Sequence, residues 1–411
     1  MIKNLILIVI ILFLIFPAKA KDNFIFSTST YIGERTTSQD YEEEDTDYSY
    51  RYNGYNFNIK YKKPNLNYFL GSSINKKDYK TKDYLDNISR LLKTELLYYL
   101  KKDKINYTEL NTELNYKEKR YKNSPNYEYN RITLIPTIKF KRKDQYISLI
   151  FGIDSFSYLE DTDKDKIKIM GGFEIKKYLL EKKIVLLLSY RQEFNKQENN
   201  TRKNKNKFKS EFSYVFNKPL IYKITTGIDF KDLDTKEKDI DQDLEYRYFK
   251  YYIKTEHRIN KRLETSLKYE RFKKNYTENS LDNSGFLIKN NWDYEILKNK
   301  DNKINFDFDL GYEEKNYELE DQSYKKKTMG FDIFYQRKDS HKLKFGIEKI
   351  FYNFEEKINN KNKTAFKFGI EKFLFNRDLS LGLDLKYKIL DYKSAKDEKQ
   401  KEIKFSFIYK F

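Results

Sequence analysis

Cysteine is absent from this chain of 411 residues, and its absence removes several classes of protein. Disulfide frameworks, thiolate catalysis, cysteine-bound zinc and lipoprotein anchoring through an N-terminal cysteine all require that residue. Proline and glycine are also few, at 5 and 13 residues, which excludes a collagen-like or loop-rich chain. Regular secondary structure therefore has to account for most of the chain.

Long apolar runs are missing after residue 20, and the mean hydropathy is −0.89. No later segment is apolar enough to cross a bilayer as a helix. The chain nevertheless carries 38 Tyr and 32 Phe, too many aromatic residues for a disordered protein. The two observations agree if apolar and polar residues alternate along strands, so that one face meets lipid and the other meets water.

The first twenty residues are the exception, and they have the pattern of an export signal. Lys3 supplies a positive start, Leu5 to Phe16 is apolar, and Ala18-Lys19-Ala20 provides the small residues that signal peptidase requires. As a helix the apolar run would reach about 18 Å, short of the ~30 Å hydrocarbon core. The sequence predicts that residues 1–20 are a cleaved signal peptide and that residues 21–411 form a single domain.

That domain reads as a series of segments in which apolar and polar residues alternate. A period of two sustained over nine to twelve residues is typical of a half-buried strand, and we find no i, i+3, i+4 pattern of a helical repeat. The clearest apolar faces are Ile147, Leu149, Phe151 and Ile153; Ile304, Phe306, Phe308, Leu310 and Tyr312; and Leu379, Leu381, Leu383, Leu385, Tyr387 and Ile389.

Connections of two kinds separate the segments. Nine tight polar turns, from Lys63-Pro64 to Asn376-Arg377, recur about every 40 residues, and a longer polar connection lies between successive turns. Short periplasmic turns and longer external loops are the pattern of an outer-membrane barrel. The sequence predicts an all-β, antiparallel, up-and-down transmembrane barrel of about 20 strands. Weaker alternation between Ile88 and Tyr116 leaves 18 strands as an alternative.

The chain ends in a motif of its own. Ile403, Phe405, Phe407, Tyr409 and Phe411 alternate with polar residues, and the last residue is aromatic. This resembles the C-terminal signature of Gram-negative outer-membrane β-barrel proteins, although no single family within that class is indicated. The resemblance implies a location in the bacterial outer membrane and a final strand that the barrel-assembly machinery recognises. It also implies contacts with periplasmic chaperones, membrane lipids and lipopolysaccharide; the oligomeric state stays open.

Barrel closure gives a physical reason for alternation up to the last residue. An open sheet edge would leave unpaired N–H and C=O groups in hydrocarbon, at several kcal/mol each. We therefore expect the final strand to pair with the first, around Phe24 to Ile32.

The sequence offers little for catalysis. The two histidines, His257 and His341, both fall beside tight turns and so at the expected periplasmic end. We find no phosphate-binding loop and no metal-ligand spacing. The sequence predicts neither an enzyme nor a cofactor. The net charge of +19, or +17 without Lys3 and Lys19, is scattered along the chain, and we interpret it as attraction to anionic lipids or solutes rather than to nucleic acid.

Residues opposite the apolar faces should line the interior, and a barrel of 18 to 20 strands leaves an aqueous channel. We predict a porin-like channel for passive diffusion of small hydrophilic, preferentially anionic solutes. A structural or adhesive barrel, and a polymer-export conduit filled by a partner protein, are the alternatives. The candidate lining residues are Lys223, Asp229, Lys268, Asp307, Asp309, Lys344, Lys367, Glu371, Asp384 and Lys386.

Overall fold

The structure is a computed structural model of the chain. It describes residues 24–39, 49–80, 82–103, 106–198, 202–216, 221–236, 245–277, 281–319, 322–356, 359–375, 378–393 and 398–410. The predicted signal peptide, residues 1–20, and the last residue, Phe411, lie outside these ranges. Within the described residues no helix is long and apolar enough to span a membrane.

Twenty antiparallel strands make up the described chain, each hydrogen-bonded to its sequence neighbours. They are β1 (Phe24–Gln39), β2 (Tyr50–Lys63), β3 (Leu66–Tyr79), β4 (Asn87–Lys102), β5 (Tyr107–Tyr121), β6 (Tyr129–Arg142), β7 (Gln145–Tyr158), β8 (Lys166–Leu179), β9 (Ile184–Gln197), β10 (Arg202–Val215), β11 (Ile221–Lys236), β12 (Tyr246–Arg258), β13 (Leu263–Tyr276), β14 (Asn283–Lys298), β15 (Asn302–Tyr317), β16 (Tyr324–Arg337), β17 (His341–Phe354), β18 (Lys361–Leu374), β19 (Leu379–Tyr392) and β20 (Glu398–Lys410).

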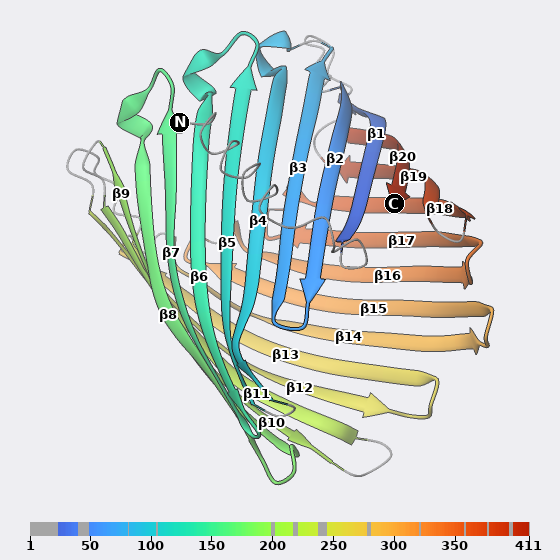
Figure 1. The fold of residues 1–411 in the computed structure, drawn as a ribbon. Helices are drawn as coiled ribbons and strands as arrows, with labels where there is room; N and C mark the ends of the chain where they lie inside the picture. The colour runs from blue at the N-terminus through green and yellow to red at the C-terminus, as the bar shows by residue number, and fades with distance from the viewer. Residues whose placement is uncertain are drawn as a thin grey trace.

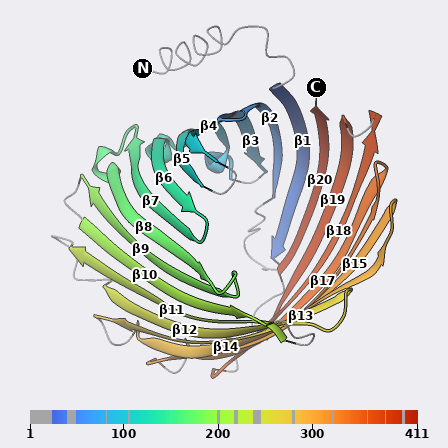
Figure 2. The ribbon, with the colours of Figure 1, turned by 60° about the horizontal axis from the view of Figure 1, so that its bottom comes forward.

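The sheet closes on itself, because β1 also pairs with β20. Thr28 lies opposite Tyr409 and Ile32 opposite Phe405, so the predicted pairing of the first and last strands is confirmed. Figure 1 shows β1 beside β20, and Figure 2 shows the strands arranged as a ring. The prediction of 20 strands is confirmed, and the alternative of 18 is wrong.

The two ends of the barrel differ. Short turns connect β2 to β3, β4 to β5 and so on around one end, which we call the turn end; both β1 and β20 have their chain-terminal ends there. The other connections lie at the opposite end, the loop end. Three of them contain a 3-10 turn that lies wholly within the described residues: η2 (Asp83–Leu85), η3 (Pro125–Tyr127) and η4 (Thr162–Lys164).

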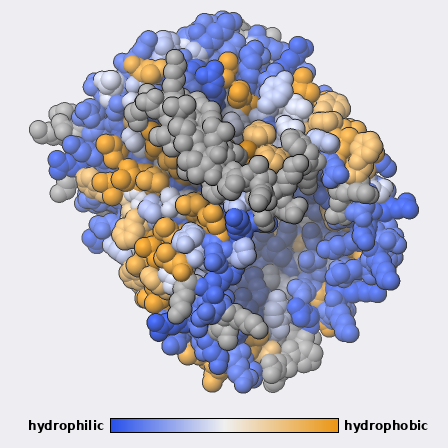
Figure 3. Space-filling view, in the orientation of Figure 1, coloured by the Kyte–Doolittle hydropathy of each residue, from blue (hydrophilic) through white to orange (hydrophobic). Residues whose placement is uncertain are grey.

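Alternation places the apolar side chains outside and the polar ones inside. Ile153, Ile169, Phe405 and many other large apolar residues are exposed on the outer face, whereas Glu109, Asp154, Glu193 and Glu270 are buried on the inner one. A soluble protein shows the reverse distribution. The space-filling view looks into a hollow whose visible lining is predominantly hydrophilic (Figure 3).

Candidate functional site: the lumen wall

A charged patch covers the inner face of β10 to β13. It lines a pocket of about 390 Å³ that includes Lys223, Asp229 and Lys268. Lys223 pairs with Glu256 at 3.2 Å, and Lys268 pairs with Glu270 at 2.5 Å. Asp229 lies between two lysines, 3.7 Å from Lys231 and 3.8 Å from Lys250. Three of the sequence-derived lining residues thus meet in one place.

A second pocket, of about 450 Å³, lies across β17 to β20 and β1 near the turn end. Lys344, Glu371 and Asp384 contribute to its lining, together with small residues such as Ser29, Gly382 and Ser406. Glu371 is paired with Lys342 at 3.0 Å. Lys386 lies nearby on β19, 3.7 Å from Glu402. Lys367 on β18 stands opposite Lys386 in the strand register.

An acidic row interrupts this pattern on the strands between the two pockets. Asp307 on β15 lies directly opposite Asp293 on β14 and Asp332 on β16. Like charges directly opposite one another are destabilising in a sheet. Asp309, two residues along, accepts a hydrogen bond from Asn291 and lies 3.9 Å from Lys289. The described residues contain no group of carboxylates placed to hold a metal ion.

Lysines in the middle of the lumen are mostly neutralised by carboxylates. Lys93 pairs with Glu95 at 2.6 Å, Lys209 pairs with Glu211 at 2.9 Å, and Lys250 pairs with Glu270 at 3.4 Å. Burial of so many charges requires such pairing, because an unpaired ion in a low dielectric is strongly disfavoured. This part of the wall therefore contributes little net charge.

Lysines at the loop end are of two kinds. Lys168 and Lys363, near the starts of β8 and β18, pair with Glu193 and Glu348 at 3.1 and 3.0 Å, whereas four others lie on aromatic rings. The ammonium of Lys77 is 4.7 Å from the Tyr50 ring centroid, and that of Lys274 is 3.8 Å from the Tyr246 centroid. Lys119 and Lys315 lie 4.5 and 4.3 Å from the rings of Tyr121 and Tyr317. Within the part of the chain that the structure describes, none of these four lysines forms an ion pair.

These four lysines, which we call the mouth lysines, share a local sequence. Each is the first residue of a Lys-x-Tyr triplet that ends its strand: 77–79 on β3, 119–121 on β5, 274–276 on β13 and 315–317 on β15. The side chains of Lys119, Lys274 and Lys315 also donate to the hydroxyl of the tyrosine in the same triplet. The recurrence of the triplet was the signal by which sequence reasoning could have found them.

The tyrosine of each triplet is held by the loop that follows. The Tyr79 N–H donates to Asp86 Oδ1 at 2.6 Å, and the Tyr317 N–H donates to Ser323 Oγ at 2.9 Å. The backbone carbonyl of Asp86 in turn accepts from the Lys122 N–H of the next loop at 3.0 Å. Such a capping residue therefore joins its own loop to its neighbour.

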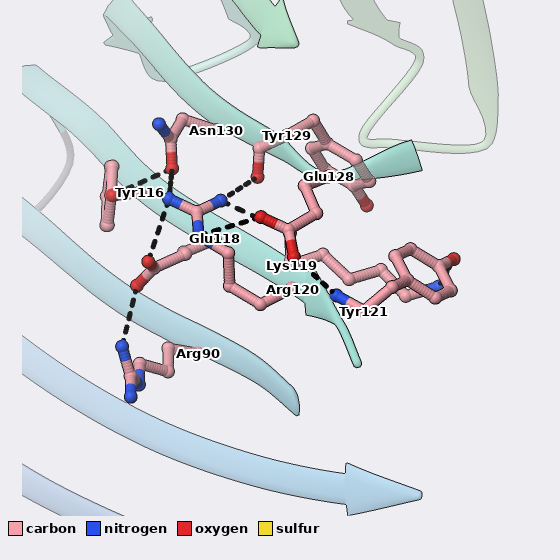
Figure 4. Close-up of polar contacts among 9 residues, drawn as sticks. All are labelled: Arg90, Tyr116, Glu118, Lys119, Arg120, Tyr121, Glu128, Tyr129 and Asn130. Carbon is pink, nitrogen blue, oxygen red and sulfur yellow. Dashed lines mark hydrogen bonds and ion pairs between the residues drawn. The ribbon is translucent and has the colours of Figure 1, made fainter. Parts of the chain in front are cut away.

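Figure 4 shows the same arrangement around Glu128. Glu128 Oε1 accepts the Tyr121 N–H at 3.0 Å, while Oε2 lies 3.6 Å from Arg120 Nε. Arg120 also contacts Glu118 at 2.9 Å, and Glu118 contacts Arg90 at 3.2 Å. These contacts tie β4, β5 and β6 together at the loop end.

Glycines allow two tyrosine rings to lie against the wall beside the closing seam. Gly33 faces Tyr52 and Gly54 faces Tyr31 across the β1–β2 pair. A Cβ on Gly33 would lie 2.4 Å from the Tyr52 ring, so only glycine fits. The Tyr52 hydroxyl donates to Glu402 on β20 at 3.1 Å, and the side chain thereby bridges β1.

Two further predicted groups can be located. Ile403, Phe405, Phe407 and Tyr409 all lie exposed on the outer face of β20, as alternation predicts. His257 and His341 lie at the turn end, in β12 and β17, where they contact the hydroxyls of Thr255 and Ser340 at 2.9 Å. Their predicted position is confirmed.

No protein-family model matches the chain, and no curated protein sequence matches it significantly. Among solved structures, the outer-membrane transporter YddB from Escherichia coli aligns at TM-score 0.58 and 8% identity, over 93% of this chain and 81% of YddB. The ferric citrate transporter FecA aligns at TM-score 0.55 and 9% identity, over 93% of this chain and 78% of FecA. OccK9 of Pseudomonas aeruginosa matches at TM-score 0.45 and 9% identity, over 95% of this chain and 100% of OccK9. At the level of the fold, the prediction of a bacterial outer-membrane β-barrel is confirmed.

Proposed function

We propose that the chain is an outer-membrane channel through which small hydrophilic solutes, preferentially anions, diffuse passively. The observation that carries the proposal is the distribution of charge along the lumen. Lysines in the middle of the wall are paired with carboxylates, whereas the mouth lysines, Lys77, Lys119, Lys274 and Lys315, have no described carboxylate partner. These four lysines therefore place positive charge at the loop end that no described ion pair neutralises.

A positive opening raises the local concentration of anions, because low-dielectric walls focus the field along the channel. The paired interior then presents polar groups of both signs that can replace part of a solute's hydration shell. The preference should weaken as salt rises from about 0.1 M to 1 M, since the Debye length falls from about 10 to 3 Å. The absence of catalytic groups remains part of this proposal.

Reversal potentials in a planar bilayer under a KCl gradient test the proposal. We expect anion preference in the wild type and a smaller preference after replacement of the four mouth lysines by glutamine. A matched control replaces Lys76, Lys273, Lys325 and Lys327, which are exposed on the outer face at the loop-end ends of β3, β13 and β16. The control loses the same charge and should keep the wild-type selectivity.

Two results would contradict the proposal. Cation preference in the wild type would show that the mouth lysines do not set the field. A correctly folded barrel with no conductance would favour a structural or adhesive barrel, or a conduit that a partner protein fills.

A further inference from the structure

The second half of the barrel repeats the first at a nearly constant shift. Each strand from β1 to β10 begins 195 to 197 residues before the strand ten places later, and ends 195 to 197 residues before it. For example, β4 spans Asn87–Lys102 and β14 spans Asn283–Lys298, a shift of 196 at both ends. Figure 2 shows β4 and β14 on opposite sides of the ring.

A chain of twenty strands built from equal hairpins would also show a constant ten-strand shift, but the hairpins of this chain are not equal in length. A shift of two strands, which is one hairpin, varies from 36 to 44 residues along the chain. The spacing between successive even strands runs 37, 42, 37 and 36 from β2 to β10, and 37, 41, 37 and 37 from β12 to β20. The uneven spacing of the strands in the first half therefore recurs in the second half.

One backbone defect repeats at the same shift. The β4–β5 ladder has a bulge between Tyr99 and Lys101, and the β14–β15 ladder has one between Glu295 and Leu297. The capping bonds of the loop end repeat as well: Tyr79 to Asp86 corresponds to Tyr276 to Asp282, the latter at 2.5 Å. Bulges are specific local features rather than a general property of strands.

Side chains confirm the correspondence. Leu85-Asp86-Asn87 matches Leu281-Asp282-Asn283, and in both copies the asparagine side chain donates to the leucine carbonyl, at 2.7 and 3.0 Å. The mouth lysines fall into two equivalent pairs, Lys77 with Lys274 and Lys119 with Lys315. Between β8 and β18, Lys166, Lys168, Phe173, Ile175, Lys177 and Leu179 recur as Lys361, Lys363, Phe368, Ile370, Lys372 and Leu374.

The two seams between the halves are also equivalent. At one seam Val215 of β10 lies opposite Lys223 of β11, and at the other Lys410 of β20 lies opposite Ser27 of β1. A single ten-strand sheet would expose two open edges, whose unpaired backbone groups are costly in a membrane. When two such sheets join edge to edge, the backbone groups of both open edges are hydrogen-bonded.

The end of the first half carries the motif that ends the chain. Phe212-Ser213-Tyr214-Val215-Phe216 corresponds to Phe407-Ile408-Tyr409-Lys410-Phe411 at a shift of 195 residues, with aromatic residues at the same three positions. Phe212 and Phe407 are both exposed on the outer face, each at 40%. Other strands that run toward the turn end lack this ending; β12, for instance, ends Thr255-Glu256-His257-Arg258.

We propose that the barrel consists of two fused copies of one ten-strand unit, and that Phe212, Tyr214 and Phe216 form the first unit's own terminal-strand signal. This segment is then a second site for the machinery that inserts barrels into the membrane. The inference rests on the assembly role predicted for Ile403 to Phe411, which removal of Phe411 from the unpermuted chain tests separately.

Circular permutation of the full chain tests the second site. One permutant joins residue 411 to residue 21 through a short linker and opens the chain between 216 and 217, so that Phe216 becomes the last residue behind a new signal peptide. The control permutant has the same linker and opens the chain after Ile259, at the turn that follows β12. Surface level and heat-modifiable migration of the barrel are measured for both.

We expect the permutant that ends at Phe216 to reach wild-type-like levels and the control to assemble several-fold less. Equal assembly of the two permutants, at any level, would overturn the proposal. In the unpermuted chain, Phe212→Glu is compared with Phe140→Glu, since both residues are 40% exposed near the turn end. Only Phe212 lies in the proposed signal, so its replacement should lower the assembled fraction several-fold more; equal losses would overturn the second site.

Discussion

Arg131 holds Asp154 across the β6–β7 pair through two parallel hydrogen bonds, Nε to Oδ1 at 2.8 Å and Nη2 to Oδ2 at 2.7 Å. Asp154 is only 4% exposed, and Thr133 donates a third hydrogen bond to it at 2.8 Å. Planar, bidentate pairing of this kind is the strongest form of ion pair between side chains. It fixes the register of two strands from inside the lumen.

Replacement of Arg131 by leucine should lower the free energy of unfolding by about 3 kcal/mol, because the carboxylate of Asp154 is left buried without its partner. Urea unfolding of the barrel in lipid vesicles measures the loss. As a control, Lys342→Leu removes one partner of a more exposed pair with Glu371 and should cost about 1 kcal/mol or less. Equal losses in the two variants would contradict the argument.

The close packing of Gly33 in the β1–β2 pair, next to the closing seam, predicts that a larger residue at this position destabilises the barrel. Gly33→Ala would press a methyl group against the Tyr52 ring and the Ile403 carbonyl, at 2.4 and 2.6 Å, so the ring must move and its bond to Glu402 must break. Overpacking of this kind costs about 1 to 3 kcal/mol. Gly171→Ala is the matched control, since nothing lies within 4 Å of its Cβ position. A lower melting point for Gly33→Ala alone, read from heat-modifiable migration, is the expected result.

The hydrogen bond between the Tyr79 N–H and Asp86 predicts that loss of the Asp86 carboxylate lets the end of β3 open locally. Asp86→Ala removes the acceptor of the Tyr79 N–H, which should cost about 1 kcal/mol and speed hydrogen exchange at that amide. Asp86→Asn keeps an acceptor oxygen, so the Tyr79 amide should still exchange slowly in that variant. Asp83→Ala alters an exposed contact of the same loop, with Asn123, and should leave the Tyr79 amide protected. Unchanged exchange in Asp86→Ala would show that the cap does not hold the loop.

The aromatic residue at the end of the chain, Phe411, is predicted to promote membrane insertion. Deletion of Phe411, or its replacement by a charged residue, should lower insertion and increase periplasmic degradation, because the aromatic end of the alternation from Ile403 onward is lost. Surface labelling and heat-modifiable migration measure the effect. Unchanged surface levels would remove the support for an assembly signal in β20.

Sequence reasoning was strongest where one face of a strand meets lipid. Strict alternation along segments such as Ile304 to Tyr312 predicted the strands, their inner and outer faces and the number of turns, because a one-residue slip would bring charged groups to the hydrocarbon. The signal was weakest in β4, where apolar residues occupy both faces and a bulge between Tyr99 and Lys101 breaks the register. The bulge explains why the alternation from Ile88 onward is hard to follow.

The sequence by itself determined the class of fold, the pairing of the first strand with the last, and the inward position of the charged residues. Each follows from a local period of two that continues to the end of the chain. Only the tertiary structure decided which charges neutralise each other. Glu193 meets Lys168 and Lys207 on two different neighbouring strands, and the mouth lysines meet tyrosines instead. Such partners are set by cross-strand register and by the closure of the sheet, which bring together residues far apart along the chain. For the same reason Tyr52 reaches Glu402, 350 positions away, only once β1 has paired with β20.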